Sequence, residues 1–232
     1  MMLTRAATTL VVLVLCCASP TSGQTAASRT QVARPAPPAA PAEPENPENG
    51  AAREWTFSAM LSGYNVPGDR LYPQPTVTAD RHRLHLEARY NYEDLDTGSA
   101  WVGYNLGGGE KVAWELTPMV GGVFGNVVAV APGYRGSVGW RKLEFASEGE
   151  YVFGSKDDEE WFFYNWSELT VAPADWWRVG MATQRTRAYT ADRDTQRGIV
   201  AGFSYRSLDA AFYLFNPDDD VSIVVATVSF GF

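Results

Sequence analysis

The side chains best suited to chemistry lie close together in one segment. The chain has two histidines, His82 and His85, and His85 lies two residues from both Arg83 and Glu87. In a β-strand these alternate residues share one face. Histidine is the side chain best matched to proton transfer near neutral pH. No serine motif marks a nucleophile. A place in a charged strand face is therefore the first interpretation of His85, and its role as the one candidate catalytic residue is the alternative.

Other kinds of chemistry find no support in the sequence. Both cysteines, Cys16 and Cys17, lie in an N-terminal apolar run, so the chain has no thiol once that run is removed. Neither a Gly-rich phosphate loop nor a metal-ligand spacing occurs, and we expect no cofactor and no metal centre. The formal net charge is −8, and no basic stripe with interleaved aromatic residues is present. Nucleic acid is therefore excluded as a partner.

The N-terminal part of the chain is typical of a secreted protein. One positive residue precedes an apolar run that falls short of the roughly 20 residues needed to cross a bilayer, and small residues follow. This pattern predicts a signal peptide over residues 1–23, with cleavage after Gly23. Residues 24–52 are rich in Pro and Ala and lack aromatic residues, which predicts a disordered periplasmic linker. Residues 53–232 then form one domain.

The domain is predicted to be all-β, because its apolar residues recur at every second position in short segments. The clearest segment is 83–92, whose two faces are Leu84, Leu86, Ala88, Tyr90 and Tyr92 against Arg83, His85, Glu87, Arg89 and Asn91. Ten such segments can be marked, at 53–64, 83–92, 99–106, 111–119, 134–154, 160–171, 175–189, 196–206, 209–216 and 221–232.

The polar faces of these segments carry many charges. In a soluble barrel these charges would either face the solvent or be buried in the core, where each buried charge would cost several kcal/mol. A membrane barrel instead places them in a polar lumen. We therefore expect a closed antiparallel up-and-down transmembrane barrel whose narrow interior is lined by charges. A soluble periplasmic barrel is the alternative. The expected lumen network is Arg83, His85, Glu87, Arg89, Glu115, Glu144, Glu148, Glu150 and Arg178.

The last segment carries a resemblance to a known class of proteins. The chain ends in VATVSFGF, with Val224, Ala226, Val228, Phe230 and Phe232 on one face. This segment resembles the C-terminal strand of Gram-negative outer-membrane β-barrel proteins. The resemblance implies an outer-membrane location, contact with its lipid and lipopolysaccharide, and recognition of Phe230 and Phe232 by the barrel-assembly machinery. The strings LHLEARYNYED, LEFASEGEYVF and FFYNWSEL resemble a family of predicted barrels of unassigned function, so no reaction is implied.

The number of strands follows from parity, because both termini of such a barrel face the periplasm and the number is even. Ten strands are expected and twelve are the alternative, since the segment 134–154 changes phase near Arg141 by a bulge or a strand end. With ten strands, the link EDLDTG falls on the periplasmic side, and the links GGGE and NVPGDRLYPQPTVTAD fall outside. Aromatic residues at strand ends, Tyr90 and Tyr92 among them, are expected at the membrane interfaces.

Three function classes follow in order of preference. The first is a structural or surface-interaction barrel, the second a narrow channel or small-solute transporter. The third is a lipid-acting enzyme that uses His85, which we expect near the outer end of its strand. The acidic loop tips at 157–160 and 218–220 are expected to be solvated charge, with binding of divalent cations as the alternative. The oligomeric state stays open.

Overall fold

The computed structural model describes residues 54–67, 71–154, 161–188, 194–219 and 222–232. The predicted signal peptide at 1–23, the predicted linker at 24–52 and the acidic tip at 157–160 lie outside this part of the chain. The described residues form strands, turns and loops without a helix. Accordingly, none of them belongs to a helix long and apolar enough to cross a membrane.

The described part of the chain has thirteen strands in one sheet. They are β1 (Thr56–Asn65), β2 (Tyr72–Arg81), β3 (Leu84–Tyr90), β4 (Thr97–Tyr104), β5 (Leu106–Gly108), β6 (Ala113–Gly125), β7 (Ala129–Trp140), β8 (Leu143–Gly154), β9 (Phe162–Ala174), β10 (Trp177–Ala188), β11 (Asp194–Tyr205), β12 (Leu208–Phe215) and β13 (Ile223–Gly231).

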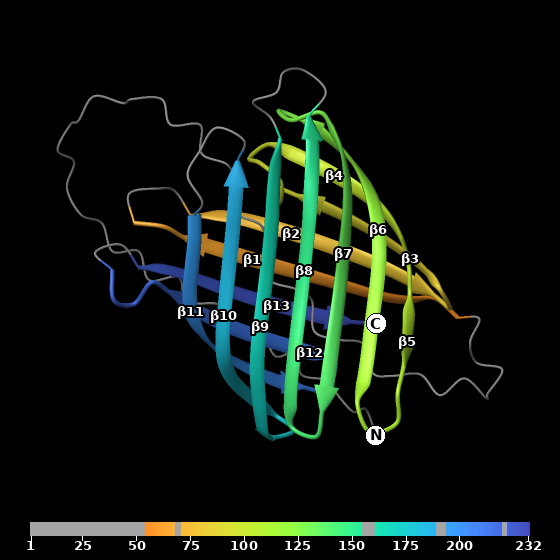
Figure 1. Ribbon diagram of the computed structural model, residues 1–232, viewed down its shortest axis with the longest axis vertical. Coiled ribbons are helices and arrows are strands. Elements are labelled where there is room, and N and C mark those ends of the chain that lie inside the picture. The colour runs from red at the N-terminus through yellow and green to blue at the C-terminus, as the bar shows by residue number, and fades with distance from the viewer. Residues whose placement is uncertain (1–53, 68–70, 155–160, 189–193, 220–221) are drawn as a thin grey trace, which may run out of the picture. The chain divides into compact units, whose positions relative to one another are not determined.

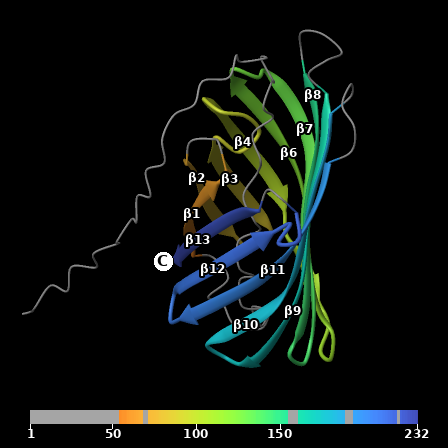
Figure 2. The ribbon, with the colours of Figure 1, turned by 90° about the vertical axis from the view of Figure 1, so that its left-hand side faces the viewer.

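The sheet closes into a barrel (Figure 1). Consecutive strands other than β4 and β5 pair antiparallel, and the pairing of β1 with β13 joins the first strand to the last (Figure 2). β5 continues β4 beyond Asn105, and both pair with β6, so the barrel has twelve strands around its wall and one short extra strand. The predicted closed antiparallel barrel is confirmed, with the second of the two predicted strand numbers.

One of the two additional strands is β2, which, apart from its last residue, lies within the predicted outer link NVPGDRLYPQPTVTAD and carries Pro73 and Pro75. A central strand is paired on both sides, and proline lacks the N–H that would donate to one of the two neighbouring strands. Proline therefore normally argues against a central strand. Here both prolines pair with β1, while the ladder between β2 and β3 begins only at Thr76. The missing N–H groups therefore face the side on which no ladder is formed.

The other additional strand comes from the stretch 134–154. The phase change near Arg141 is the end of β7, and the two-residue turn 141–142 leads directly into β8. Arg141 has a φ of 56°, in the left-handed region that such tight turns use. The alternative of a bulge within one strand is therefore wrong.

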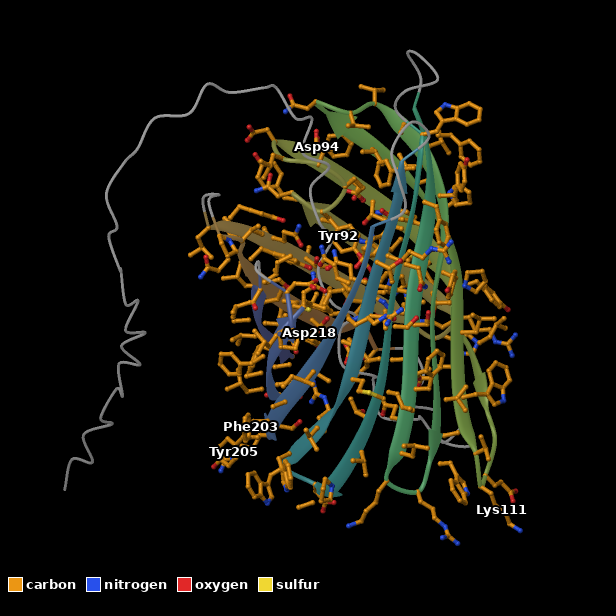
Figure 3. All side chains as sticks on the ribbon, turned by 60° about the vertical axis from the view of Figure 1, so that its left-hand side comes forward. Tyr92, Asp94, Lys111, Phe203, Tyr205 and Asp218 are labelled. Atoms are coloured by element: carbon orange, nitrogen blue, oxygen red, sulfur yellow. The ribbon has the colours of Figure 1, made fainter. Side chains whose placement is uncertain are left out.

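The two ends of the barrel differ in the length of their links. We call the end at which β1 starts the terminal end, where the links are 82–83, 109–112, 141–142, 175–176 and 206–207. At the opposite loop end the links are 66–71, 91–96, 126–128, 155–161, 189–193 and 216–222. Short turns are typical of the periplasmic side of outer-membrane barrels. Figure 3 shows Lys111 and Tyr205 at the terminal end and Asp94 at the loop end.

The missed strand β2 also reversed two predicted link positions. EDLDTG was expected on the periplasmic side and GGGE outside. In the structure, residues 93–96 of EDLDTG lie in the β3–β4 link at the loop end, and residues 109–110 of GGGE lie in the β5–β6 link at the terminal end. Each omitted strand shifts the side of every link between it and the next omission, which explains why these two predictions were wrong together.

The outer face of the barrel is mostly apolar, as predicted for contact with lipid. On β3 the side chains of Leu84 and Leu86 are 39% and 38% exposed, whereas those of His85, Glu87 and Arg89 are each 4% exposed. The predicted two faces of this strand are confirmed. A lipid-facing charge at mid-membrane would cost about 2–4 kcal/mol, which is the reason for this arrangement.

The C-terminal residue is held in the sheet that closes the barrel. The backbone N–H of Phe232 donates to the carbonyl of Phe57 at 2.9 Å, and the N–H of Phe57 donates back to Phe232 at 2.9 Å. The rings of these two residues stack at 5.8 Å, and Phe230 stacks on Phe232 at 5.9 Å. The last strand therefore ends without an unpaired edge, which lipid would not tolerate.

Candidate functional site

The centre of the lumen is organised around the guanidinium of Arg89 on β3. Its Nε donates to Glu87, and its Nη1 donates to Glu150 on β8 at 2.9 Å. The rings of Tyr92 and Trp101 lie 4.0 and 4.5 Å from the guanidinium carbon. Because β4, β6 and β7 lie between β3 and β8 in the sheet, the bond to Glu150 crosses the interior of the barrel.

A second guanidinium completes this group of charges. Arg135 on β7 places its Nη2 2.9 Å from Glu87 and its Nε 3.7 Å from Glu148. Glu87 thus lies between two guanidiniums, and all of these side chains except that of Arg135 are buried. We call Glu87, Arg89, Arg135, Glu148 and Glu150 the central cluster. A buried charge requires such partners, since the loss of one leaves an uncompensated charge in a medium of low dielectric.

The β3–β4 link folds into the lumen against the central cluster. Tyr92 donates its hydroxyl hydrogen to Glu148, and its ring meets Tyr164 edge-on at 6.1 Å. Figure 3 shows Tyr92 within the barrel, while Asp94 lies at the loop end. The residues at both ends of this link, Asn91 and Asp96, have φ values of 57° and 54°. Asn and Asp tolerate this left-handed conformation better than other non-glycine residues, which lets the link turn inward.

Trp101 on β4 fits against the cluster because the facing strands carry glycine. A Cβ atom at Gly121 on β6 would lie 2.4 Å from the indole ring. The indole N–H donates to Ser99 at 2.9 Å, and Ser99 donates to Glu93 at 2.6 Å. Because Gly121 has no side chain, the indole ring of Trp101 can fill the space above β6 and lie beside Arg89.

His85 is bonded on both sides by carboxylates. Its Nδ1 lies 2.8 Å from Asp80, and its Nε2 lies 3.1 Å from Glu87. Asp80 also accepts a hydrogen bond from Asn105 at 2.7 Å. His85 follows the 82–83 turn and so lies near the terminal end, not the outer end at which we expected it. No hydroxyl group among the described residues is bonded to it, which leaves the imidazole without a nucleophile to activate.

A second group of charged side chains lies in the lumen toward the terminal end, and we call Asp80, Glu115, Glu144, Arg178 and Asp209 the acidic vestibule. Arg178 on β10 binds both carboxylate oxygens of Asp209 on β12, at 2.6 and 2.8 Å. The side chains of Asp80, Arg178 and Asp209 keep 34, 21 and 16% of their surface exposed. In the described part of the chain, the carboxylates of Glu115 and Glu144 have neither an ion pair nor a hydrogen bond.

The side of the lumen formed by β9 and β12 is aromatic. Trp166 meets Tyr213 and Phe215 edge-on, both at 5.1 Å between ring centroids. The indole N–H of Trp166 and the hydroxyl of Tyr213 both donate to Glu168, at 2.7 and 2.8 Å. One buried carboxylate is thus held by two neutral donors.

The structure brings together most of the predicted lumen residues. Glu87, Arg89, Glu148 and Glu150 meet in the central cluster with His85 beside it, and Glu115, Glu144 and Arg178 lie in the acidic vestibule. Arg83 lies elsewhere: it is exposed in the 82–83 turn, and its Nη1 donates to Tyr104 at 2.8 Å. Its place in the turn before β3 removes it from the strand alternation on which the prediction rested.

Sequence reasoning missed several residues of the lumen. Asp80 was hidden in the unrecognised strand β2, and Arg135 in a stretch whose phase was ambiguous. Tyr92 was expected at a membrane interface, but the inward fold of its link buries it. Glu168 gave no signal, because β9 has aromatic residues on its inner face and apolar residues toward the terminal end of its outer face. The one signal in the sequence that could have revealed Asp80 was its small separation from His85, because a tight turn between them brings the two side chains together.

Comparison with known proteins reveals the class of the fold. No protein-family model and no curated protein matches the chain. The solved structure of the KdgM porin matches with a TM-score of 0.56 and 10% identity, over 75% of this chain and 99% of the porin. The KdgM porin in complex with disordered oligogalacturonate gives 0.57 and 9%, over 75% and 99%. The Acinetobacter baumannii outer membrane protein Omp33 gives 0.45 and 11%, over 78% and 100%.

The class follows from the fold and the outer face together. A closed barrel with an apolar exterior and a charged interior is the arrangement of outer-membrane proteins. The fold shared with the two porin structures agrees with this, and identities of about 10% carry the likeness no further than the fold. The protein is therefore a porin-like outer-membrane β-barrel protein of a Gram-negative cell.

Proposed function

We propose that the protein is a narrow channel for small hydrophilic solutes across the outer membrane. This places the second of the three predicted function classes first. Twelve strands enclose a wider interior than the ten that were expected, and barrel diameter grows with strand number. The likeness to two porin structures supports the same class, although it extends to the fold alone.

The observation that carries the proposal is the acidic vestibule. Glu115 and Glu144 face the interior from β6 and β8 and have no ion-pair partner among the described residues. An ionised carboxylate without a partner is stable only in contact with water. A purely structural barrel would have no use for such groups inside its wall, whereas a water-filled path needs them or other polar side chains.

Tyr92 and the central cluster form the narrow part of this path. The bond from Arg89 to Glu150 crosses the interior, and Tyr92 extends from the cluster to Tyr164. These contacts make the channel narrow, and they restrict it to solutes far smaller than a sugar polymer. The oligogalacturonate found with the KdgM porin is a chain of several sugars, and such a chain is too large for a channel this narrow.

A structural barrel remains the second candidate, and the same cross-lumen contacts favour it. If they seal the interior, the barrel serves as a scaffold or as a surface for partners. Contact with lipopolysaccharide and recognition of Phe230 and Phe232 by the barrel-assembly machinery belong to both candidates. A lipid-acting enzyme has less support, because both ring nitrogens of His85 are bonded to carboxylates near the terminal end.

Planar-bilayer conductance of the refolded protein separates the two candidates. A channel predicts discrete conductance steps in KCl, and Tyr92→Ala should raise the step size because it shortens the side chain that crosses the lumen. Leu86→Ala, on the outer face of β3, is the matched control and should leave the step size unchanged. A folded wild-type protein without conductance would establish the structural barrel instead.

A further inference from the structure

The charges that face the lumen are unequal in sign. Among the described residues, three guanidiniums face the interior, those of Arg89, Arg135 and Arg178. Carboxylates are three times as many: Asp80, Glu87, Glu93, Glu115, Glu144, Glu148, Glu150, Glu168 and Asp209. A path lined by one sign of charge attracts ions of the opposite sign and repels those of its own sign.

The guanidiniums are already engaged. Arg89 is bound to Glu87 and Glu150, and Arg178 holds Asp209 with two nitrogens. Arg135 lies within 4 Å of Glu87 and Glu148. An anion that entered the lumen would have to compete with a carboxylate at each of these three positions.

The excess carboxylates lie along the path at two levels. In the acidic vestibule, Glu115 pairs in register with Ser137 on β7, and Glu144 pairs with Gly139 on the same strand. The two carboxylates therefore lie on strands that flank β7, at neighbouring positions of its inner face. Neither has a cation within ion-pair distance among the described residues.

The second level is the central cluster together with the adjoining Glu93, where two carboxyl oxygens have no hydrogen-bond partner among the described residues. Oε2 of Glu93 and Oε1 of Glu150 have no hydrogen-bond partner, and the two residues are 0% and 3% exposed. A buried carboxyl oxygen without a hydrogen-bond partner is unfavourable unless a proton, a cation or another donor reaches it. Both oxygens belong to residues beside Arg89, at the narrow part of the lumen.

We infer that the lumen is selective for small cations, with Glu115 and Glu144 concentrating them and the free oxygens of Glu93 and Glu150 stabilising them at the narrow level. The inference rests on the proposed channel function and names its solute class. No group of three or more metal-ligating side chains occurs in the described part of the chain. The interaction is therefore the weak, exchangeable kind that conduction requires, not a metal site.

The reversal potential of the refolded protein in a KCl gradient tests this inference. We expect a permeability for K⁺ greater than that for Cl⁻. The double variant Glu115→Gln/Glu144→Gln should lower the K⁺ to Cl⁻ permeability ratio, because a unit charge about 4 Å from an ion in water changes the local concentration of each ion by up to roughly fivefold, in opposite directions for K⁺ and Cl⁻. Glu110→Gln, an exposed carboxylate in the 109–112 turn, is the control and should leave the ratio unchanged.

The outcomes separate this inference from the channel proposal. A wild-type protein that conducts with a ratio at or below one overturns cation selectivity and leaves the channel standing. If the double variant conducts with the wild-type ratio, the role of Glu115 and Glu144 in selectivity is overturned and the channel proposal stands. A folded protein that never conducts overturns both. Circular dichroism of each refolded variant shows whether the barrel has formed, so a misfolded variant is recognised and replaced by the single substitutions.

Discussion

The two sides of the lumen are stabilised by different interactions, ion pairs on one side and aromatic packing with neutral hydrogen-bond donors on the other. On the charged side, Glu87 is bound by two guanidiniums, and the contacts join β3 to β7 and β8. On the aromatic side, Glu168 is bound by two neutral donors, and rings of β9 and β12 fill the space around it. Both sides bury carboxylates, but among the described residues a guanidinium lies within ion-pair distance of them only on the charged side.

The two sides therefore contribute differently to the stability of the barrel and to the arrangement of its strands. Buried ion pairs offset a large desolvation penalty and add little net stability, but they fix which strands face each other. Buried aromatic rings add stability through the area that they remove from water. We therefore expect the aromatic side to carry stability and the charged side to determine what can pass.

The largest effect should come from Trp166→Ala on the aromatic side. The substitution removes a fully buried indole and one donor to Glu168, so the free energy of unfolding should fall by about 5 kcal/mol, the upper end for such changes. Urea unfolding of the refolded protein in lipid vesicles measures it. Trp114→Ala on the outer face is the matched control. A loss of less than about 1 kcal/mol would contradict the stabilising role of this side.

Arg89→Met should have the next largest effect, on the charged side. It leaves Arg135 as the one guanidinium beside Glu87 and removes the ion-pair partner of Glu150, so the free energy of unfolding should fall by roughly 3–5 kcal/mol. Adding Glu150→Gln removes one of the uncompensated charges and should restore part of the loss. If the two substitutions are additive in urea unfolding, Arg89 and Glu150 are not coupled as the structure shows.

The same substitution at two buried tyrosines allows the two sides of the lumen to be compared directly. Tyr92→Phe and Tyr213→Phe each remove one hydroxyl that donates to a carboxylate, Glu148 and Glu168 respectively. We expect a loss of roughly 1.5–3 kcal/mol for each, the range for hydrogen bonds to charged groups. The loss should be larger at Tyr213, because Glu168 has no guanidinium within ion-pair distance among the described residues. Equal losses in urea unfolding would show that the guanidiniums make no difference.

The smallest effect on stability should come from the vestibule. Glu115→Gln/Glu144→Gln removes two unpaired carboxylates that retain contact with solvent, so the free energy of unfolding should change by less than about 0.5 kcal/mol per site. Thermal unfolding of the two proteins side by side measures the difference. A large loss would mean that these carboxylates are bound within the fold, which would remove the main support for a water-filled vestibule.

Much of the fold could be predicted from single strands. The alternation in 83–92 predicted which face of β3 meets lipid, and the apolar row from Val224 to Phe232 predicted the same for β13. Both predictions hold because a strand has a period of two and lipid excludes charge from one face. β2 was missed because proline argues against a central strand by its chemistry alone, and only the pairing with β1 shows that its N–H is dispensable there.

The class of protein could be predicted from the sequence, since patterning along each strand depends only on neighbouring residues. The number of strands, the inward turn of Tyr92 and the partners that meet across the lumen follow only from the folded barrel. Arg89 and Glu150 are 61 residues apart, and their bond depends on barrel closure and on the register of every strand between them. The division of the lumen into a charged and an aromatic side follows from the same closure, because strands far apart in the chain become opposite walls of one narrow interior.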